Sequence, residues 1–254
     1  MVLANKNDQF AQSMTHNLHS VFTRSLFLVV LLLSAKCVAV NKPLQVVTEL
    51  SPPYQTLIQN EVSGSATTTV KNLLSAANLK ATFHMYPWAR AYNKAISEPN
   101  TLIYSIAKYK ERNELFHWLL PVAHYKLGLV RLSERTDLDI TSIKDLSNFV
   151  LAVQRNDIAH LWALEQGLEE TKQLIICSDI GCSWQLLLNK KVDFIVESPE
   201  LIDSMLEHYN QPSTAAKYVI AIPELELSGY LAANINIETS ILEKLKLAIK
   251  DQSF

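Results

Sequence analysis

Short apolar segments alternate with stretches of helical periodicity along most of the chain. The segments 44–48, 81–85 and 101–106 have the length and apolar content of buried strands. Between the first two, the stretch 67–78 is apolar at positions 70, 73, 74 and 77, which is the spacing of one helix face. Strands that alternate with helices favour a mostly parallel sheet covered on both faces. We therefore expect an α/β fold.

The same alternation continues to the end of the chain. Further strands are expected around Trp118 and at 126–132, 148–154, 174–177, 192–196, 218–222 and 229–233, and helices at 87–96, 157–166, 182–188, 199–209 and 237–250, with a helix start in 137–145. The part of the chain after residue 39, about 215 residues, exceeds the usual size of a single core. We expect two lobes, the first formed by 40–125 and 216–254 and the second, inserted one by 126–215.

The N-terminal region has the pattern of a secretory signal peptide. Arg24 precedes the apolar run 26–33, and small residues follow it up to Ala39. The run is too short to span a bilayer, which needs roughly 20 residues. We expect cleavage after Ala39, export to the periplasm, and no membrane anchor afterwards; Met14 is an alternative start to Met1. Lys36 disfavours lipidation of Cys37.

Charge and motif content exclude several functions. A formal net charge of -2 does not indicate the excess of basic residues that is typical of proteins that bind nucleic acid. The five histidines after residue 39 lack the spacing of metal ligands, and no nucleophile elbow, P-loop or dinucleotide fingerprint is present. We expect no cofactor, no metal and no catalytic residue.

Cys177 and Cys182 are the cysteines that remain after signal cleavage. In an oxidising compartment, two cysteines separated by four residues are compatible with a small-loop disulfide. The alternative is a pair of buried thiols, one at the end of a strand and one at the start of a helix.

The stretch from Tyr86 to Pro121 is rich in aromatic and cationic residues. It contains four Tyr, two Trp and two Arg around a Ser-Ile-Ala turn. Aromatic faces beside guanidinium groups can hold a planar, anionic small molecule. The alternative is a well-packed core surrounded by solvated charges.

The order of motifs resembles that of a known family. A signal peptide, a first strand that runs into PPY, the sequences YPWARA and SIAKYKER, and the segment NKKVDFIVESP follow one another. In this order they resemble the bacterial extracellular solute-binding proteins of family 3, which include polar amino acid receptors of ABC importers. The resemblance covers roughly 44–250. It implies a type 2 periplasmic-binding fold, with two mostly parallel, helix-flanked sheets and a ligand cleft between the lobes.

The resemblance also implies roles for residues of the first lobe. Arg112 occupies the position of the arginine that grips a ligand carboxylate, and a guanidinium fork suits that bidentate bond. Ser105 occupies a position that supplies a hydroxyl or backbone contact. Trp88 and Tyr54 occupy positions where aromatic side chains often wall the ligand. Arg90 adds a second cation near the cleft; its alternative role is a surface ion pair with an acidic neighbour.

In the second lobe the sequence departs from the family pattern. Arg155 replaces a small residue at the start of a helix, where backbone N–H groups can hold an anion. Glu197, or Ser198 in the neighbouring register, occupies the place of the acid that pairs with a ligand ammonium. These departures leave a more acidic or differently shaped ligand open beside an amino acid.

We expect a monomeric periplasmic protein that captures a small polar, carboxylate-bearing, amino acid-like ligand by hinge closure for an ABC importer. A soluble sensor for a membrane receptor is one alternative. Another is a dehydratase-like enzyme in which Glu49 or Glu197 is the general acid. If the protein is a solute-binding protein, Arg112→Ala should abolish binding of a carboxylate ligand while the protein stays folded.

Overall fold

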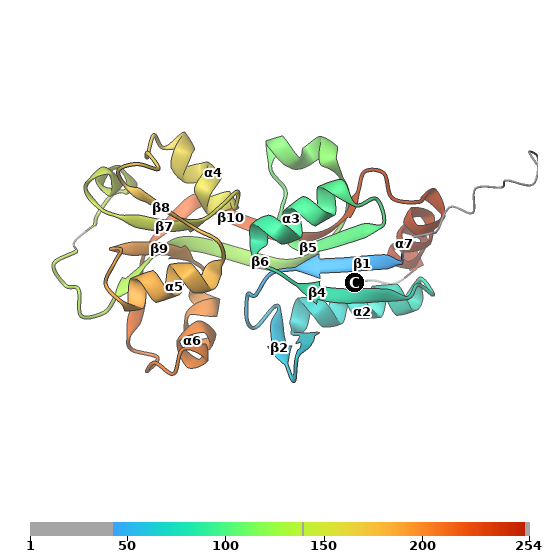
Figure 1. The fold of residues 1–254 in the computed structure, drawn as a ribbon, viewed down its shortest axis with the longest axis horizontal. Helices are drawn as coiled ribbons and strands as arrows, with labels where there is room; N and C mark the ends of the chain where they lie inside the picture. Colours follow the sequence, from blue (N-terminus) through green and yellow to red (C-terminus); the bar gives the residue numbers. More distant parts are fainter. Residues whose placement is uncertain (1–42, 139, 252–254) are drawn as a thin grey trace, which may run out of the picture. The chain divides into compact units, whose positions relative to one another are not determined.

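The computed structural model describes residues 43–138 and 140–251, so the predicted signal peptide lies outside the described residues. The chain forms a mixed α/β structure (Figure 1). In order, its elements are β1 (Leu44–Thr48), β2 (Thr56–Ile58), β3 (Glu61–Ser63), α2 (Ser65–Ala76), β4 (Ala81–Met85), α3 (Trp88–Ser97), β5 (Thr101–Ala107), the 3-10 helix η1 (Lys110–Leu115), β6 (Phe116–Leu132), the 3-10 helix η2 (Ile143–Asn148), β7 (Leu151–Gln154), α4 (Ile158–Glu165), β8 (Leu174–Cys177), α5 (Ile180–Leu188), β9 (Phe194–Glu197), α6 (Pro199–His208), β10 (Ala216–Asn234) and α7 (Thr239–Asp251).

The main sheet has eight strands in the order β4-β1-β5-β10-β6-β9-β7-β8. Its two flanks are parallel: β1 pairs with β4 and β5, and β7 pairs with β8 and β9. The central strands β6 and β10 are antiparallel to each other, and each is antiparallel to its flanking strand. Helices and strands alternate in both flanks, as the sequence pattern predicted.

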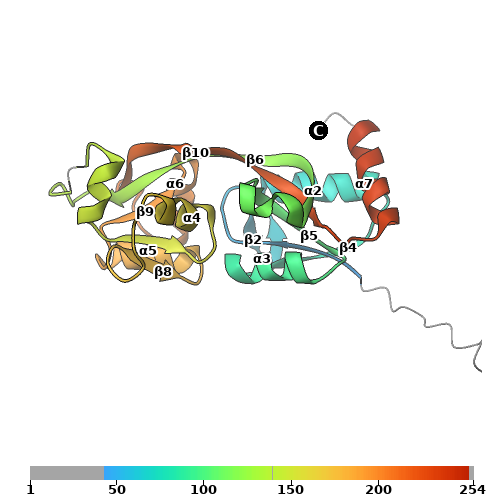
Figure 2. The ribbon, with the colours of Figure 1, turned by 90° about the horizontal axis from the view of Figure 1, so that it is seen from above.

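Strands β6 and β10 pass through both halves of the sheet (Figures 1 and 2). The sequence predicted two short strands in each of these regions, because polar residues and a proline interrupt the apolar runs. In β10 the interruption is a register shift between Ala221 and Glu226, and Pro223 lies within it. Proline lacks the N–H that a regular ladder requires, so a strand tolerates it at such an irregularity. The two halves are therefore hydrogen-bonded to each other through one continuous pair of strands.

The buried apolar side chains form four clusters, one on each face of each half of the sheet. In the first half, α2 and α7 pack on one face and α3 packs on the other. In the second half, α4 packs on one face, and α5 and α6 pack on the other. Each half thus has its own core, which is the two-lobe architecture expected from the sequence.

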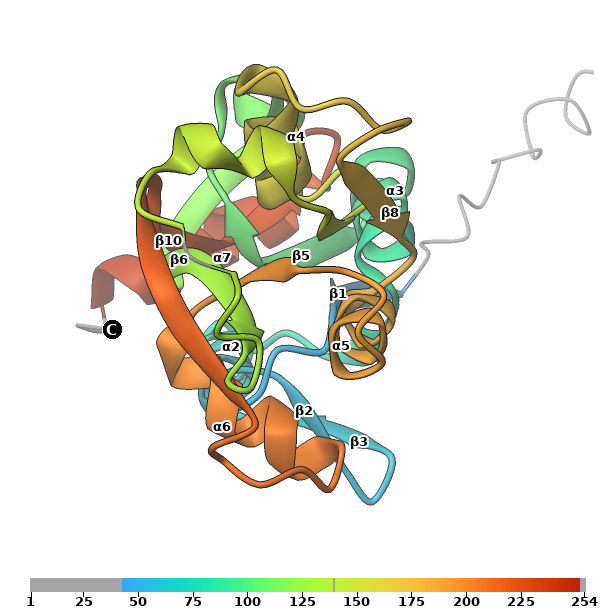
Figure 3. The same cartoon turned by 90° about the vertical axis from the view of Figure 1, so that its left-hand side faces the viewer.

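One local prediction has a different outcome. The helix start expected in 137–145 is the 3-10 helix η2, which begins after a capping box formed by Ser142 and Asp145. A hairpin of β2 and β3 projects away from the main sheet (Figure 3), in agreement with the hairpin or loop tip that the sequence favours for 61–65, and Gly64 follows it at the start of α2. Gly64 has φ of 112°, and a Cβ there would lie 2.3 Å from the carbonyl oxygen of Tyr54, so the position requires glycine.

Candidate functional site

A cleft lies where the carboxyl ends of β1, β5, β7 and β9 converge. It holds about 590 Å³ of empty space, its opening to solvent included. In sheets of this kind, ligands bind beyond the carboxyl ends of the parallel strands. Its lining residues come from both halves of the sheet and are Glu49, Leu50, Ser51, Trp88, Ser105, Ala107, Arg112, Tyr125, Leu127, Gln154, Asp157, Ile158, Ile180, Val196, Glu197 and Leu227.

Arg112 is the basic residue of this lining. It lies on η1 with only 2% of its surface exposed. Its Nη1 donates to the carbonyl of Ala107 at 3.1 Å, and its guanidinium carbon lies 5.2 Å from the ring centre of Trp88 and 5.3 Å from that of Tyr92. Burial lowers the pKa of the Arg112 guanidinium, and nearby acids, Asp157 first, act in the opposite direction. The aromatic rings and the carbonyl hold the cation in one orientation.

Asn156 links the segment after β7 to the first half of the chain. Its carbonyl accepts hydrogen bonds from Arg112 Nη2 and from Trp88 Nε1, both at 2.9 Å. Asn156 has φ of 59°, a left-handed conformation that asparagine adopts more readily than most residues. Asn156 is not among the site residues predicted from the sequence, although it directly precedes the residue that caps a predicted helix.

Three carboxyl groups face the cleft. Glu197 ends β9 with 4% exposure; its Oε1 accepts from the N–H of Ser198 at 2.9 Å, and its Oε2 accepts from Trp184 Nε1 at 3.3 Å. Burial raises the pKa of Glu197 to about 7, against the opposing effect of those two hydrogen bonds. Asp157 and Glu200 raise it further by charge repulsion.

Glu49 and Asp157 complete the set, one from each half. Burial raises the pKa of Glu49 well above its usual value, and repulsion from Asp157 adds to the effect. Asp157 caps α4 by accepting from the N–H of Ala159 at 3.4 Å. Burial raises the pKa of Asp157 as well, while Arg112 opposes the rise. The cleft therefore concentrates more negative than positive ionisable groups.

Several polar atoms of the cleft have no hydrogen-bond partner within the protein. They are Glu49 Oε2, Gln154 Oε1 and Ser105 Oγ, and all three atoms are shielded from solvent. Ser105 also has φ of 62°, which is uncommon for a residue other than glycine. Unpartnered buried polar atoms and unusual backbone angles concentrate at binding sites, where a ligand satisfies the polar groups.

The structure brings together five of the residues named from the sequence. Trp88, Ser105, Arg112, Glu197 and Glu49, the last considered as a general acid, all line the cleft, while Gln154, Asp157 and Tyr125 line it as well without having been singled out. The signals for the last three were weak, because a glutamine at a strand end and an aspartate before a helix are ordinary features of α/β chains.

Three other proposed residues lie outside the lining. Tyr54 packs edge-to-face on Tyr125, with ring centres 5.3 Å apart, and donates to the carbonyl of His124 at 2.9 Å, so it supports the wall from behind. Arg90 is exposed and stacks over the ring of Tyr86 at 4.4 Å. Arg155 is also exposed; the turn directs its neighbours, and not its own side chain, to the cleft.

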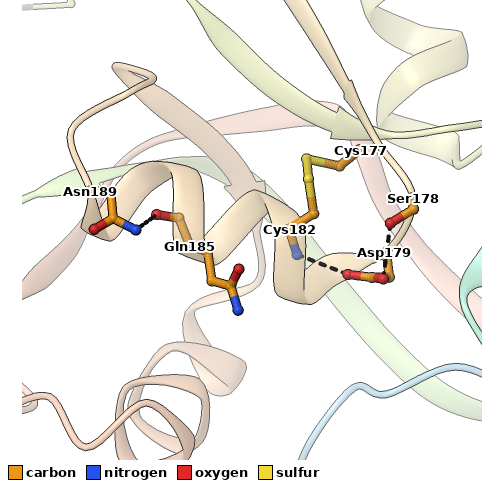
Figure 4. The surroundings of a disulfide bond; sticks show 6 residues. All are labelled: Cys177, Ser178, Asp179, Cys182, Gln185 and Asn189. Carbon is orange, nitrogen blue, oxygen red and sulfur yellow. Dashed lines mark hydrogen bonds between the residues drawn. A yellow bond between two sulfur atoms is a disulfide. The ribbon is translucent and has the colours of Figure 1, made fainter.

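The structure contains the Cys177–Cys182 disulfide (Figure 4). It joins the end of β8 to the first turn of α5, with the Cα atoms 5.5 Å apart. Asp179 caps the helix by accepting from the N–H of Cys182 at 2.8 Å, and Ser178 donates to Asp179 at 3.0 Å. The loop closed by the disulfide contains Ile180, which lines the cleft.

Other classes of site find no support in the described parts of the chain. Within 43–138 and 140–251, no group of three or more His, Cys, Asp or Glu residues is arranged to hold a metal ion. None of the described helices is long and apolar enough to cross a membrane.

The comparison with solved structures identifies the fold. No family model matches the sequence, and no curated protein matches it. A histidine kinase sensor domain similar to periplasmic binding proteins superposes with a TM-score of 0.69 at 14% identity, covering 83% of this chain and 90% of the other. The chain has a periplasmic-binding fold. The resemblance inferred from the sequence is thereby confirmed at the level of fold.

Two further structures with the periplasmic-binding fold match over similar lengths. The arginine-, lysine-, histidine-binding protein ArtJ from Geobacillus stearothermophilus gives a TM-score of 0.69 at 16% identity, covering 83% of this chain and 89% of that protein. The GluR0 ligand-binding core from Nostoc punctiforme, in complex with L-glutamate, gives a TM-score of 0.63 at 21% identity. The match covers 82% of this chain and 93% of that core.

Proposed function

We propose that the protein is a solute-binding protein that captures a small polar, amino acid-like ligand in the cleft. The observation that carries this proposal is the set of shielded, unpartnered atoms of Glu49, Gln154 and Ser105 around one cavity. A buried polar atom without a partner costs about 1–3 kcal/mol. A ligand that supplies the missing partners recovers part of that cost, so binding is favoured at this place.

The proposed mechanism is closure of two lobes around the solute. We place the lobe boundary within the two long strands, near 124–128 in β6 and near 223–228 in β10. The segment 216–221 pairs with the part of β6 that belongs to the second half, so this boundary in β10 lies beyond the one expected at 215. The hydrogen bonds from Trp88 and Arg112 to Asn156 would then form and break with closure.

An amino acid would use both kinds of charge in the cleft. Its carboxylate would bind Arg112 and its ammonium would bind Glu197, as the sequence resemblance suggested. ArtJ, which is described as binding arginine, lysine and histidine, has the same fold. Arg112 already donates to two backbone carbonyls, so a ligand carboxylate would use its remaining N–H groups.

The protein is proposed to act after export, as a monomer in the periplasm, free of a membrane anchor. An ABC importer is the partner that we favour, because proteins of that system share the fold. A membrane sensor is the alternative partner, because a histidine kinase sensor domain superposes equally well. Transport and sensing both require only that the membrane partner distinguishes the closed state of the protein from its open state.

A dehydratase-like enzyme remains the second candidate function, on one observation. Glu197, whose pKa is raised to about 7, has a proton affinity suited to a general acid. Turnover of prephenate by the purified protein tests this alternative directly. Absence of product at high enzyme concentration would eliminate it for that substrate.

A thermal-shift screen tests the proposed function. The panel contains amino acids, dicarboxylates, amines, short oligosaccharides and prephenate. A ligand at a hundredfold its dissociation constant stabilises the protein by about 2.7 kcal/mol, which raises the unfolding midpoint measurably. A raised unfolding midpoint with ligands of one chemical class supports the proposal. An unchanged midpoint with every ligand of the panel, with no binding detected by calorimetry, contradicts it.

A further inference from the structure

The cleft holds more carboxyl groups than basic groups. Among its lining residues Glu49, Asp157 and Glu197 can carry negative charge, and Arg112 is the one basic residue. Charged groups withdrawn from water need a partner of opposite sign, or they take up protons. One guanidinium balances the charge of one carboxylate, so the other two carboxyl groups either hold protons or are balanced by positive charge on the ligand, and a dicationic ligand favours their ionised form.

The single cation is engaged by the protein itself. Arg112 Nη1 donates to the carbonyl of Ala107 and Nη2 donates to the carbonyl of Asn156, while Trp88 and Tyr92 lie within cation–π distance. These two hydrogen bonds use one N–H group on each terminal nitrogen and fix the guanidinium against the protein. Arg112 is thus held in place without a ligand carboxylate.

The unsatisfied groups of the cleft, by contrast, need hydrogen-bond donors. Glu49 Oε2 and Gln154 Oε1 are acceptors without partners, and Gln154 is only 7% exposed. Ser105 Oγ can accept as well as donate. An ammonium group offers three N–H donors and a guanidinium offers five, so either would satisfy several of these atoms at once.

The remaining walls are apolar. Leu50, Leu127, Ile158, Val196 and Leu227 line the space between the carboxyl groups. Such walls favour a ligand with a hydrocarbon body, since each buried methylene contributes about 0.8 kcal/mol. The chemistry of the cleft therefore combines acidic ends with an aliphatic middle.

We propose that the ligand is a small aliphatic dication, either a diamine or an alkylamine with a guanidinium group, that is recognised through Glu49, Asp157 and Glu197 and needs no carboxylate. This inference rests on the proposed function, because it names the solute of the same cleft. It differs from an amino acid in one testable respect, which is that the carboxylate contributes no affinity.

Matched pairs of ligands test the inference by titration calorimetry on the purified protein. Cadaverine is lysine without its carboxylate, and agmatine is arginine without its carboxylate. We expect each amine to bind at least tenfold more tightly than its parent amino acid. Equal or tighter binding of the amino acids overturns the inference and leaves the proposed function standing. Absence of binding by these four ligands and by the wider screening panel overturns both.

A charge-removing variant locates the amine. Asp157→Asn keeps a helix-capping residue at the start of α4 but removes the negative charge, so the fold is expected to persist. We expect cadaverine to bind this variant at least tenfold more weakly than the wild type. Asp203→Asn, at an exposed position of α6, is the matched control and should bind as the wild type does. Unchanged affinity in Asp157→Asn, with the unfolding curve showing a folded protein, overturns the assignment.

Discussion

Arg112 Nη2 and the carbonyl oxygen of Asn156 lie 2.9 Å apart, joining the segment after β5 to the segment after β7. Trp88 donates to the same carbonyl at the same distance. Because Asn156 has a left-handed backbone, its carbonyl turns toward both donors while Asp157 begins the capping of α4. Two side chains of the first half thus donate hydrogen bonds to one backbone oxygen of the second half, at the edge of the cleft.

Replacement of Arg112 should destabilise the protein. Arg112→Met removes a buried hydrogen bond to the carbonyl of Ala107 and a partly buried one to the carbonyl of Asn156, and it leaves three nearby carboxyl groups without their cation. We expect a loss of about 2–4 kcal/mol in the free energy of unfolding, measured in urea. This revises the expectation from sequence that Arg112→Ala would spare the fold. Arg90→Met, at an exposed position, is the control and should cost less than about 0.5 kcal/mol. Equal losses in the two variants would contradict the structural role of Arg112.

The stability of the ligand-free protein should fall as the pH rises through neutrality. The carboxyl of Glu197 has its pKa raised from 4.5 to about 7, so the folded state holds a proton that the unfolded state releases more readily. The resulting stabilisation is complete below pH 4.5 and is lost as the pH passes about 7; it is on the order of 3 kcal/mol. Urea unfolding between pH 5 and 8 measures it. Glu197→Gln should reduce the slope of stability against pH, and an unchanged slope in that variant would refute the assignment to Glu197.

Binding of a cationic ligand should strengthen over the same pH range. The ligand requires ionised carboxylates, and Glu197 is mostly protonated below pH 6 because its pKa is about 7. We expect the affinity for cadaverine to rise on the order of tenfold between pH 5.5 and 7.5, with release of protons. Titration in two buffers of different ionisation enthalpy measures the released protons. An affinity independent of pH would indicate that the ligand avoids Glu197.

Loss of the disulfide should weaken the local structure around Ile180. The disulfide closes a short loop, with a sequence separation of 5, and lowers the entropy of the unfolded chain. On this basis it contributes about 2 kcal/mol to the free energy of unfolding. The double variant Cys177→Ser with Cys182→Ser should therefore unfold at a lower urea concentration than the wild type. The same variant should bind its ligand less tightly, because Ile180 lies in the loop that the disulfide closes. A wild-type urea midpoint in the double variant would show that the bond contributes little to stability.

The sequence predicted the elements of the fold better than their pairing. Strands such as 44–48 and 81–85 were located correctly, because apolar content and spacing are local properties. The sequence suggested breaks in β6 and β10, since Pro223 and the polar residues beside it resemble a turn. The long-range ladder between β6 and β10 overrides those local signals.

The candidate site was predicted in part, for a similar reason. Ser105, Arg112 and Glu197 follow or end strands, and a parallel sheet brings such positions together. Arg155 was proposed in place of its neighbours because the sequence does not show which residue of a turn faces the cleft. The positive φ of Asn156 turns the chain so that Asp157 lines the cavity while the side chain of Arg155 is exposed.

The most direct test of a ligand site in this cleft is a titration of Glu49→Gln with the best-binding solute of the panel. This variant retains the shape of the side chain but removes its charge. We predict at least tenfold weaker binding than in the wild type, and wild-type affinity in Glu61→Gln, whose side chain lies on the exposed hairpin strand β3. Equal affinity of all three proteins would place the ligand elsewhere and contradict the account.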